Sequence, residues 1–233
     1  MARAFIASSV AFAVLLATPT VVSAKIPDTW DNLIKVDSKR LEAVYLLPNA
    51  DFRPYTKVML DPTEVAFQPN WRSDINQEAQ ESDQLGGGVT DKEAMQIAAA
   101  ARTGFEEIFA KAFTDAGYQV VTTPGPDVLR LITAVADLYI DAPDTGMSMG
   151  NTYTAEAGQA TVVIEARDSQ TNAVLGRAVD VQTAGDMAGM RTSASNEEDF
   201  KILFEQWAKI AAKGLGELKA MSPIDTEGQP SSR

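Results

Sequence analysis

Two long stretches of the chain place apolar residues at every third or fourth position, which is the spacing of an amphipathic helix. The first stretch, residues 90–117, begins with the capping-box pattern T-x-x-E and ends at a glycine. The second, residues 197–220, begins close to a similar capping pair, Ser195 and Glu198. Each stretch has a single apolar face. We therefore expect two helices that each pack this face against a sheet.

Shorter stretches are apolar or alternate between apolar and polar positions, which indicates β-strands. The longest of them is apolar on both alternating faces for most of its length, which predicts an interior strand. The last two are separated by the turn-forming residues DSQTN, which predict a hairpin. In chain order, the predicted strands are residues 41–47, 57–61, 64–67, 118–122, 128–141, 160–167 and 173–182.

The order of these elements predicts an α+β fold, a two-layer sandwich with a mostly antiparallel sheet and both helices on one face. Residues 25–39 are expected to be irregular. Residues 70–89 are polar and contain three consecutive glycines, so they are expected to form a mobile connection. We predict a single domain over residues 25–221, followed by a polar, disordered tail over 222–233.

The first 24 residues have the pattern of a secretory signal peptide. Arg3 supplies a positive charge, residues 4–16 are almost wholly apolar, and V-S-A at 22–24 fits a cleavage site. A retained membrane anchor is the alternative, but the apolar run is short and Pro19 breaks it. We therefore predict cleavage after Ala24 and a periplasmic or secreted protein. No later stretch is long and apolar enough to be a transmembrane segment.

Composition narrows the chemistry of the chain. It has 233 residues, 32 acidic against 20 basic, a formal net charge of −12, and neither cysteine nor histidine. The lack of cysteine excludes disulfides, thiolate metal sites and a lipid-bearing cysteine, and the lack of histidine excludes a Ser–His–Asp triad. The acidic balance disfavours nucleic acid and anionic lipid as partners. No cofactor, metal site or catalytic residue is predicted.

Acidic residues on or near neighbouring predicted strands raise the alternative of a hydrolase of envelope polymers. Such an enzyme needs two carboxyl groups about 5–10 Å apart in a cleft. Among 32 acidic residues, some pair will meet that spacing by chance, so solvated acids that keep the protein soluble are the favoured interpretation. The candidates are Asp137, Asp141, Asp144 and Glu165.

Four of the eight methionines fall in two glycine-flanked loops, Met147 with Met149 and Met187 with Met190. In a three-strand meander these loops leave the sheet at the same end, an arrangement that would allow the two pairs to converge. Thioethers are soft ligands that suit Cu(I), which makes copper carriage one alternative. Methionine also forms adaptable contact surfaces, and a partner-binding surface is the preferred functional interpretation.

Several weak motifs occur in a characteristic order along the chain. They include VYLLPNAD at 44–51, Y-x-K-V-x-L-D-P-x-E-V-x-F at 55–67 and GYQVV at 117–121. In this order, over about residues 36–221, they resemble a bacterial envelope family of unknown function, DUF3313. Tyr55 and Phe67 are candidates for a partner surface, but the alternative, that they fill the core beside a turn, is favoured.

The resemblance implies an exported envelope protein and carries no catalytic residues. Members of that family are typically lipoproteins, and this chain departs from the pattern because it has no cysteine to carry a lipid. We therefore predict an exported, non-catalytic protein that binds another protein or a cell-envelope component. A carboxylate hydrolase and small-ligand or Cu(I) carriage stay open as alternatives, and the oligomeric state cannot be read from the sequence.

Overall fold

The computed structural model describes residues 27–81, 88–141, 152–154, 157–185, 189–191 and 193–225. The helices of this part of the chain are α1 (Trp71–Glu81), α2 (Asp91–Asp115) and α3 (Ser193–Met221). The strands are β1 (Thr29–Trp30), β2 (Leu33–Val36), β3 (Ala43–Leu46), β4 (Lys57–Leu60), β5 (Glu64–Phe67), β6 (Gln119–Val120), β7 (Val128–Ile140), β8 (Thr152–Thr154), β9 (Gly158–Asp168), β10 (Val174–Ala184) and β11 (Gly189–Arg191).

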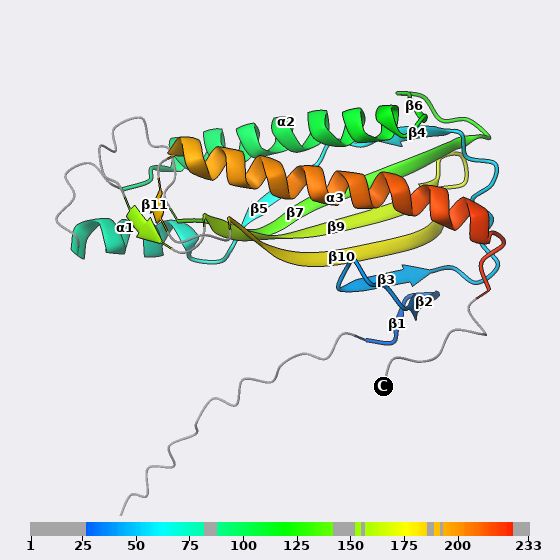
Figure 1. Ribbon diagram of the computed structural model, residues 1–233, viewed down its shortest axis with the longest axis horizontal. Coiled ribbons are helices and arrows are strands. Elements are labelled where there is room, and N and C mark those ends of the chain that lie inside the picture. Colours follow the sequence, from blue (N-terminus) through cyan, green and yellow to red (C-terminus); the bar gives the residue numbers. More distant parts are fainter. Residues whose placement is uncertain are drawn as a thin grey trace, which may run out of the picture.

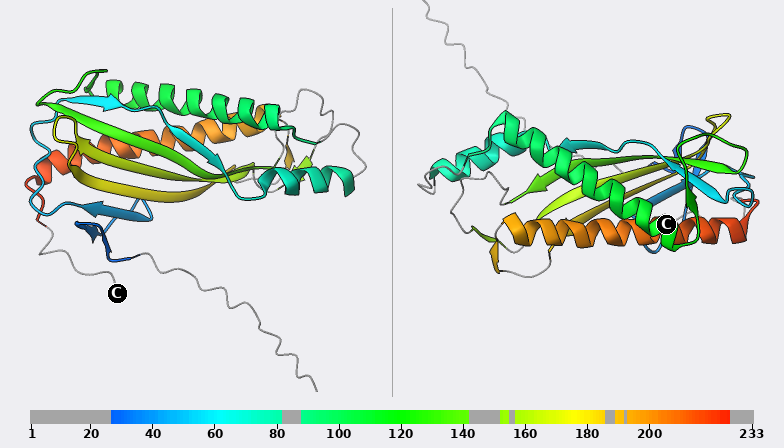
Figure 2. Two further views of the ribbon diagram at one scale, coloured as in Figure 1. Left: turned by 180° about the vertical axis from the view of Figure 1, so that it is seen from behind. Right: turned by 90° about the horizontal axis from the view of Figure 1, so that it is seen from above.

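One sheet of nine strands forms the first layer, in the order β1-β2-β3-β10-β9-β7-β4-β6, with β5 also paired to β7. Most neighbours are antiparallel, whereas β4 and β5 run parallel to β7 and β6 runs parallel to β4. Helices α2 and α3 lie side by side across one face of this sheet and form the second layer (Figures 1 and 2). The predicted α+β sandwich with two helices on one face is confirmed.

Helix α2 begins and ends where the sequence predicts. The Thr90 hydroxyl accepts a hydrogen bond from the Glu93 backbone N–H, and the Glu93 carboxylate accepts one from the Thr90 backbone N–H. This capping box satisfies two backbone N–H groups that have no partner within the helix. After the helix, Gly117 has φ of 90°, a left-handed conformation that glycine adopts without a steric penalty.

The core lies between the two helices and the sheet. Phe105, Phe109 and Phe113 follow one another at a spacing of four residues along α2, so their rings line one face. The ring of Phe204, from α3, meets Phe105 edge-on at 5.2 Å between centroids. Trp207, one turn further along α3, is fully buried as well. These aromatic contacts join both helices to each other above the sheet.

The prediction of a mobile connection over residues 70–89 is wrong in its first half, where α1 forms. Only two residues of this helix are buried, Trp71 and Ile75, so the sequence shows too few apolar positions to reveal a helical period. The Trp71 indole N–H donates to the backbone oxygen of Ile140 at 3.0 Å, and its ring stacks on Phe67. Contacts with the rest of the fold therefore anchor a helix that its own pattern does not reveal.

Two further predictions need correction near the ends of the domain. Residues 25–39 were expected to be irregular, but β1 and β2 form a hairpin there, with Asp31 at a φ of 56° in the turn. Helix α3 begins at Ser193, two residues before the predicted cap, so Ser195 is inside the helix instead of at its start. Within the described ranges, no helix combines the length and the apolar character needed to cross a membrane.

Candidate functional site

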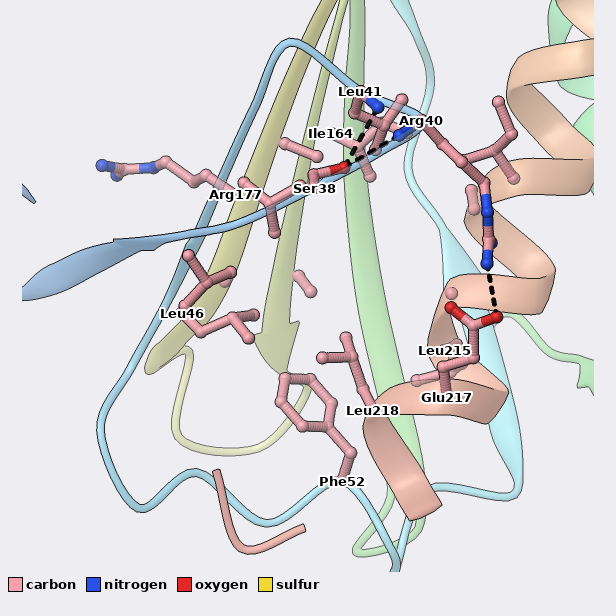
Figure 3. A pocket seen from close by; sticks show the side chains of 18 of the residues that line it. Ser38, Arg40, Leu41, Leu46, Phe52, Ile164, Arg177, Leu215, Glu217 and Leu218 are labelled. Carbon is pink, nitrogen blue, oxygen red and sulfur yellow. Dashed lines mark hydrogen bonds and ion pairs between the residues drawn. The ribbon is translucent and has the colours of Figure 1, made fainter. Parts of the chain in front are cut away.

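A pocket of about 430 Å³ lies between the C-terminal half of α3 and the sheet. Its walls are α3, strands β3, β7, β9 and β10, and the loop of residues 37–42 that joins β2 to β3. Leu46 of β3, Ile164 of β9, Leu215 and Leu218 of α3, and Phe52 from the segment after β3 point into one space in Figure 3. The pocket is therefore part of the sandwich interior that the helices leave unfilled.

The floor of the pocket is apolar and belongs to the main core. Phe52, Phe113, Leu129 and Leu131 line it, and each of them is buried. Water in such a place finds few hydrogen-bond partners, so the space favours an apolar occupant.

Small residues on facing elements create the space. Ala166, Gly176 and Ala178 lie on the strands, and Ala211 and Gly214 lie opposite them on α3. Larger side chains at these positions would fill the gap between helix and sheet.

The surroundings of the two glycines that line the pocket differ. A Cβ atom on Gly176 would lie 3.0 Å from Leu46 Cδ2 and 3.1 Å from the Tyr45 carbonyl oxygen, so close strand packing explains that glycine. A Cβ atom on Gly214 would meet no heavy atom within 4 Å. Glycine inside a helix costs roughly 0.5–1 kcal/mol relative to alanine. Packing therefore does not require glycine at position 214, and the space beside Gly214 belongs to the pocket.

The loop of residues 37–42 forms one lip of the pocket. The Ser38 hydroxyl accepts hydrogen bonds from the backbone N–H groups of Arg40 and Leu41, which fixes the turn. The Arg40 guanidinium then reaches across the opening to the Glu217 carboxylate on α3, with 2.6 Å between Nη2 and Oε1 (Figure 3). The side chains of this pair are 40% and 43% exposed, so the ion pair lies at the mouth of the pocket in contact with water.

The far end of the same loop is fixed by a buried carboxylate. Asp180, on β10, is 3% exposed. Its Oδ1 accepts from the Glu42 backbone N–H at 3.0 Å, and its Oδ2 accepts from the Trp207 indole N–H at 2.8 Å and from Gln182. One side chain thus connects the lip of the pocket, the sheet and α3.

The predicted carboxylate candidates do not converge on this pocket. Glu165 is on the opposite side of β9, between Arg167 and Arg177, which both donate hydrogen bonds to it. Asp137 occupies a bulge in β7 with φ of 48°, and Asp141 follows the end of that strand. Asp144 lies outside the described residues. In the described part of the chain, no cluster of three or more acidic residues could hold a metal ion.

The environment of Glu165 favours its ionised form. Burial works to raise the pKa of Glu165, but the hydrogen bonds and positive charges of Arg177 and Arg167 outweigh burial and leave this pKa below its ordinary value. A general acid of a hydrolase needs the opposite shift. Glu165 therefore has the character of a structural ion-pair residue.

This shift has a consequence for stability against pH. Because the folded-state pKa of Glu165 is lowered, its stabilising contribution is present above the unfolded-state pKa of about 4.3 and is lost as the pH falls through the folded-state pKa. We expect Glu165→Gln to lower the free energy of unfolding near neutral pH by about 1–3 kcal/mol. Urea unfolding should then show a smaller loss between neutral and acidic pH in this variant than in the wild type. Glu64→Gln, at an exposed position of β5, is the control, and an equal acid loss in wild type and Glu165→Gln would contradict the assignment.

Tyr55 and Phe67 occupy packing positions. Tyr55 is 6% exposed, and its hydroxyl donates to the Asp168 carboxylate at 2.9 Å. Burial, followed by this hydrogen bond, raises the pKa of Tyr55. Phe67 stacks on Trp71 with 4.0 Å between ring centroids. Tyr55 is thus buried and Phe67 is half-buried against the core, and neither ring lines the pocket.

The two methionine-bearing loops are joined by their backbones. Strands β8 and β11 pair antiparallel, with Met190 opposite Tyr153 in the register. Met147, Met149 and Met187 lie outside the described residues, so the convergence of the two methionine pairs stays a prediction.

No motif in the sequence identified the pocket residues. One signal was available, since A-A-K-G-L-G at 211–216 concentrates small residues in an otherwise ordinary amphipathic helix. This run of small residues indicates only the wall of the pocket that α3 forms. The opposite wall depends on which strands lie under α3, and the sequence does not reveal the strand order.

The fold places the chain among α+β proteins with two long helices over a mostly antiparallel sheet. The family model described as "Protein of unknown function (DUF3313)" matches residues 24–211, and the chain belongs to this family. Among curated protein sequences, none matches the chain.

The likeness to solved structures is distant, as two examples show. A PelC dodecamer from Paraburkholderia phytofirmans is 13% identical with a TM-score of 0.37, covering 71% of this chain and 94% of that one. A protein of family DUF330 from Xanthomonas campestris is 11% identical with a TM-score of 0.40, covering 75% of this chain and 91% of that one. Similarity at this level says nothing about the role of the pocket.

Proposed function

We propose that this protein is an exported, non-catalytic binding protein that holds the apolar chain of a cell-envelope amphiphile in the pocket between α3 and the sheet. The observation that carries the proposal is the pocket itself, about 430 Å³ in volume and lined by apolar side chains on its floor. Sites for small ligands have volumes of about 300–1,000 Å³ and are mostly apolar.

The size of the pocket suits one hydrocarbon chain. The pocket volume of about 430 Å³ lies near the lower end of the range for small-ligand sites, about 300–1,000 Å³, which suits one alkyl chain better than the two chains of a diacyl lipid. A single-chain amphiphile, with its chain inside and its head at the mouth, is the occupant that fits.

The other parts of the proposal rest on the sequence and on Glu165. The predicted signal peptide supports export, and amphiphiles with one long chain are components of cell envelopes. The lack of histidine and cysteine removes the commonest catalytic side chains, and the lowered pKa of Glu165 gives no support to a carboxylate hydrolase.

The test is a binding measurement with an uncharged probe. We expect dodecyl maltoside, kept below its micellar concentration, to bind the purified protein in isothermal titration calorimetry with a stoichiometry of one. Within the series of octyl, decyl and dodecyl maltosides, each added methylene should tighten binding by about fourfold because about 0.8 kcal/mol accompanies its burial.

Gly214→Leu should abolish this binding while keeping the protein folded. The leucine side chain extends into open pocket space, and replacing a helical glycine with leucine raises helix propensity by nearly 1 kcal/mol. We expect at least tenfold weaker binding and unchanged or higher thermal stability. Gly216→Leu makes the same chemical change on the exposed side of the same helix and should bind normally. Equal binding by the wild type and Gly214→Leu would refute the pocket as the site.

A further inference from the structure

The mouth of the pocket carries the charges that would meet the head of a bound amphiphile. Asp37, Lys39 and Arg40 lie on the loop, and Glu217 lies on α3. Arg177 also borders the pocket, but its guanidinium points away, as Figure 3 shows, and contacts Asp31, Glu165 and the ring of Trp30. The loop residues and Glu217 are therefore the charged groups available to a head group.

Two cations at the mouth are available to a ligand. Among the described residues, the Lys39 ammonium has no hydrogen bond or ion-pair partner, and its side chain is exposed. Arg40 has one charged partner, Glu217, which it contacts through one nitrogen of its five-donor guanidinium. An ion pair this exposed contributes little stability, so a second anion can compete for Arg40 at low cost.

We propose that the amphiphile bound in this pocket has an anionic head group, a carboxylate or a phosphate, which Lys39 and Arg40 bind in place of Glu217. This inference rests on the proposed function and adds the chemical class of the ligand. Arginine binds carboxylates and phosphates through paired N–H donors, and the neighbouring lysine supplies a second positive charge. The head group takes over the position of the Glu217 carboxylate, which then turns to solvent.

The negative net charge of the chain is no obstacle to this assignment. A charge of −12 repels an anionic surface, but charges separated by more than about 8–10 Å are largely screened at physiological salt. The groups at the mouth therefore decide head-group selectivity. Asp37 opposes an anion there, so Asp37→Asn should tighten binding.

The last residues of the chain are a poor alternative occupant. Residues 226–233 have the sequence TEGQPSSR, which contains no apolar side chain long enough to fill the floor beside Phe52 and Leu131. A second copy of the chain would have to insert a long apolar segment under the loop. An amphiphile with one alkyl chain and an anionic head group can contact both the apolar floor and the cationic lip of the pocket.

The experiment compares three head groups on one chain length. Dodecanoate, dodecyl phosphate and dodecyl maltoside are titrated into the wild type and into Lys39→Gln, Arg40→Gln, Arg40→Lys and Glu217→Gln. For the two anions we expect Lys39→Gln and Arg40→Gln to weaken binding by about five- to tenfold, as for the loss of a partly exposed charge-assisted hydrogen bond. Arg40→Lys should retain most of the affinity, and Glu217→Gln should tighten binding by about two- to fivefold. The affinity for dodecyl maltoside should stay within about twofold in all four variants.

The decisive result is that substitutions at Arg40 and Glu217 change the affinity for the two anions in opposite directions. If the ion pair only held the loop in place, both substitutions would change the binding of all three probes in the same direction, and that result would overturn the inference. Tighter binding of dodecyltrimethylammonium than of either anion would overturn it too. A preference for dodecanoate would assign a fatty acid, and a preference for dodecyl phosphate would assign a lysophospholipid head, both within the proposed class.

Failure of the inference is distinguishable from failure of the proposed function. If dodecyl maltoside binds and Gly214→Leu blocks it, but the head-group variants have no effect, the pocket function stands and the anionic head is wrong. If none of the probes binds the wild type, the proposed function fails and the inference fails with it.

Discussion

Replacing Phe105 with alanine is expected to lower the free energy of unfolding by about 3–5 kcal/mol, the range for large-to-small changes at buried aromatic positions. Phe105 is 0% exposed, and its ring stacks on Phe109 at 4.1 Å and meets Phe204 edge-on. It is therefore the aromatic link between α2 and α3. The alanine variant loses the transfer free energy of the ring and leaves a cavity that its rigid aromatic neighbours cannot close.

Urea unfolding followed by far-ultraviolet circular dichroism measures this change. Phe105→Leu keeps most of the apolar volume and should lose less than half as much stability as the alanine variant. Met95→Ala is the matched control, because Met95 lies on the same helix and is 66% exposed, so we expect an effect within about 0.5 kcal/mol. A loss below about 1 kcal/mol for Phe105→Ala would mean that α2 and α3 are not joined by this cluster.

The elements that the sequence predicted well are those whose own pattern is strong. Helix α2 has both a capping box and a regular apolar stripe, and the structure shows both. Strand β7, predicted to be an interior strand, lies inside the sheet between β9 and the parallel strands β4 and β5. In these segments local preference and tertiary environment agree, so local reasoning succeeds.

The elements that were missed depend on distant contacts. Helix α1 is held by Trp71, whose indole reaches the backbone of Ile140, nearly seventy positions away. The hairpin of β1 and β2 adds to the edge of the sheet through pairing with β3, which no pattern within residues 25–39 reveals. Such elements form because a partner surface exists, and the partner cannot be read from the segment itself.

The pocket was missed for a related reason. Its walls come from α3 and from strands whose neighbour relations follow the order β3-β10-β9-β7, and this order brings Ala178 and Gly176 opposite Gly214. Small residues are common in both helices and strands, so their alignment carries meaning only once the layers are assembled. The candidate carboxylates could be named from the sequence, but their charge alone did not reveal their role. In the structure Glu165 pairs with two arginines.

Replacing Asp180 with alanine is expected to lower the free energy of unfolding by about 3–5 kcal/mol, because it leaves the buried indole N–H of Trp207 without an acceptor and also removes the acceptor of the part-buried Glu42 backbone N–H. An unsatisfied buried donor costs about 1–3 kcal/mol, and the removed carboxylate adds a small cavity. Asp180→Asn keeps the shape and one acceptor oxygen, so its loss should be smaller, about 1–3 kcal/mol.

The same substitution should also loosen the lip of the pocket. The Glu42 backbone N–H is bonded to Asp180 Oδ1, and this bond fixes the end of the loop that carries Lys39 and Arg40. We therefore expect hydrogen exchange at the Glu42 amide of Asp180→Ala to accelerate by more than the global loss of stability explains. Trp207→Phe removes the indole donor but leaves the Glu42 bond, so it should lower stability without this local effect. Equal acceleration in both variants would show that the loop simply follows the global opening of the fold and that Asp180 does not hold it independently.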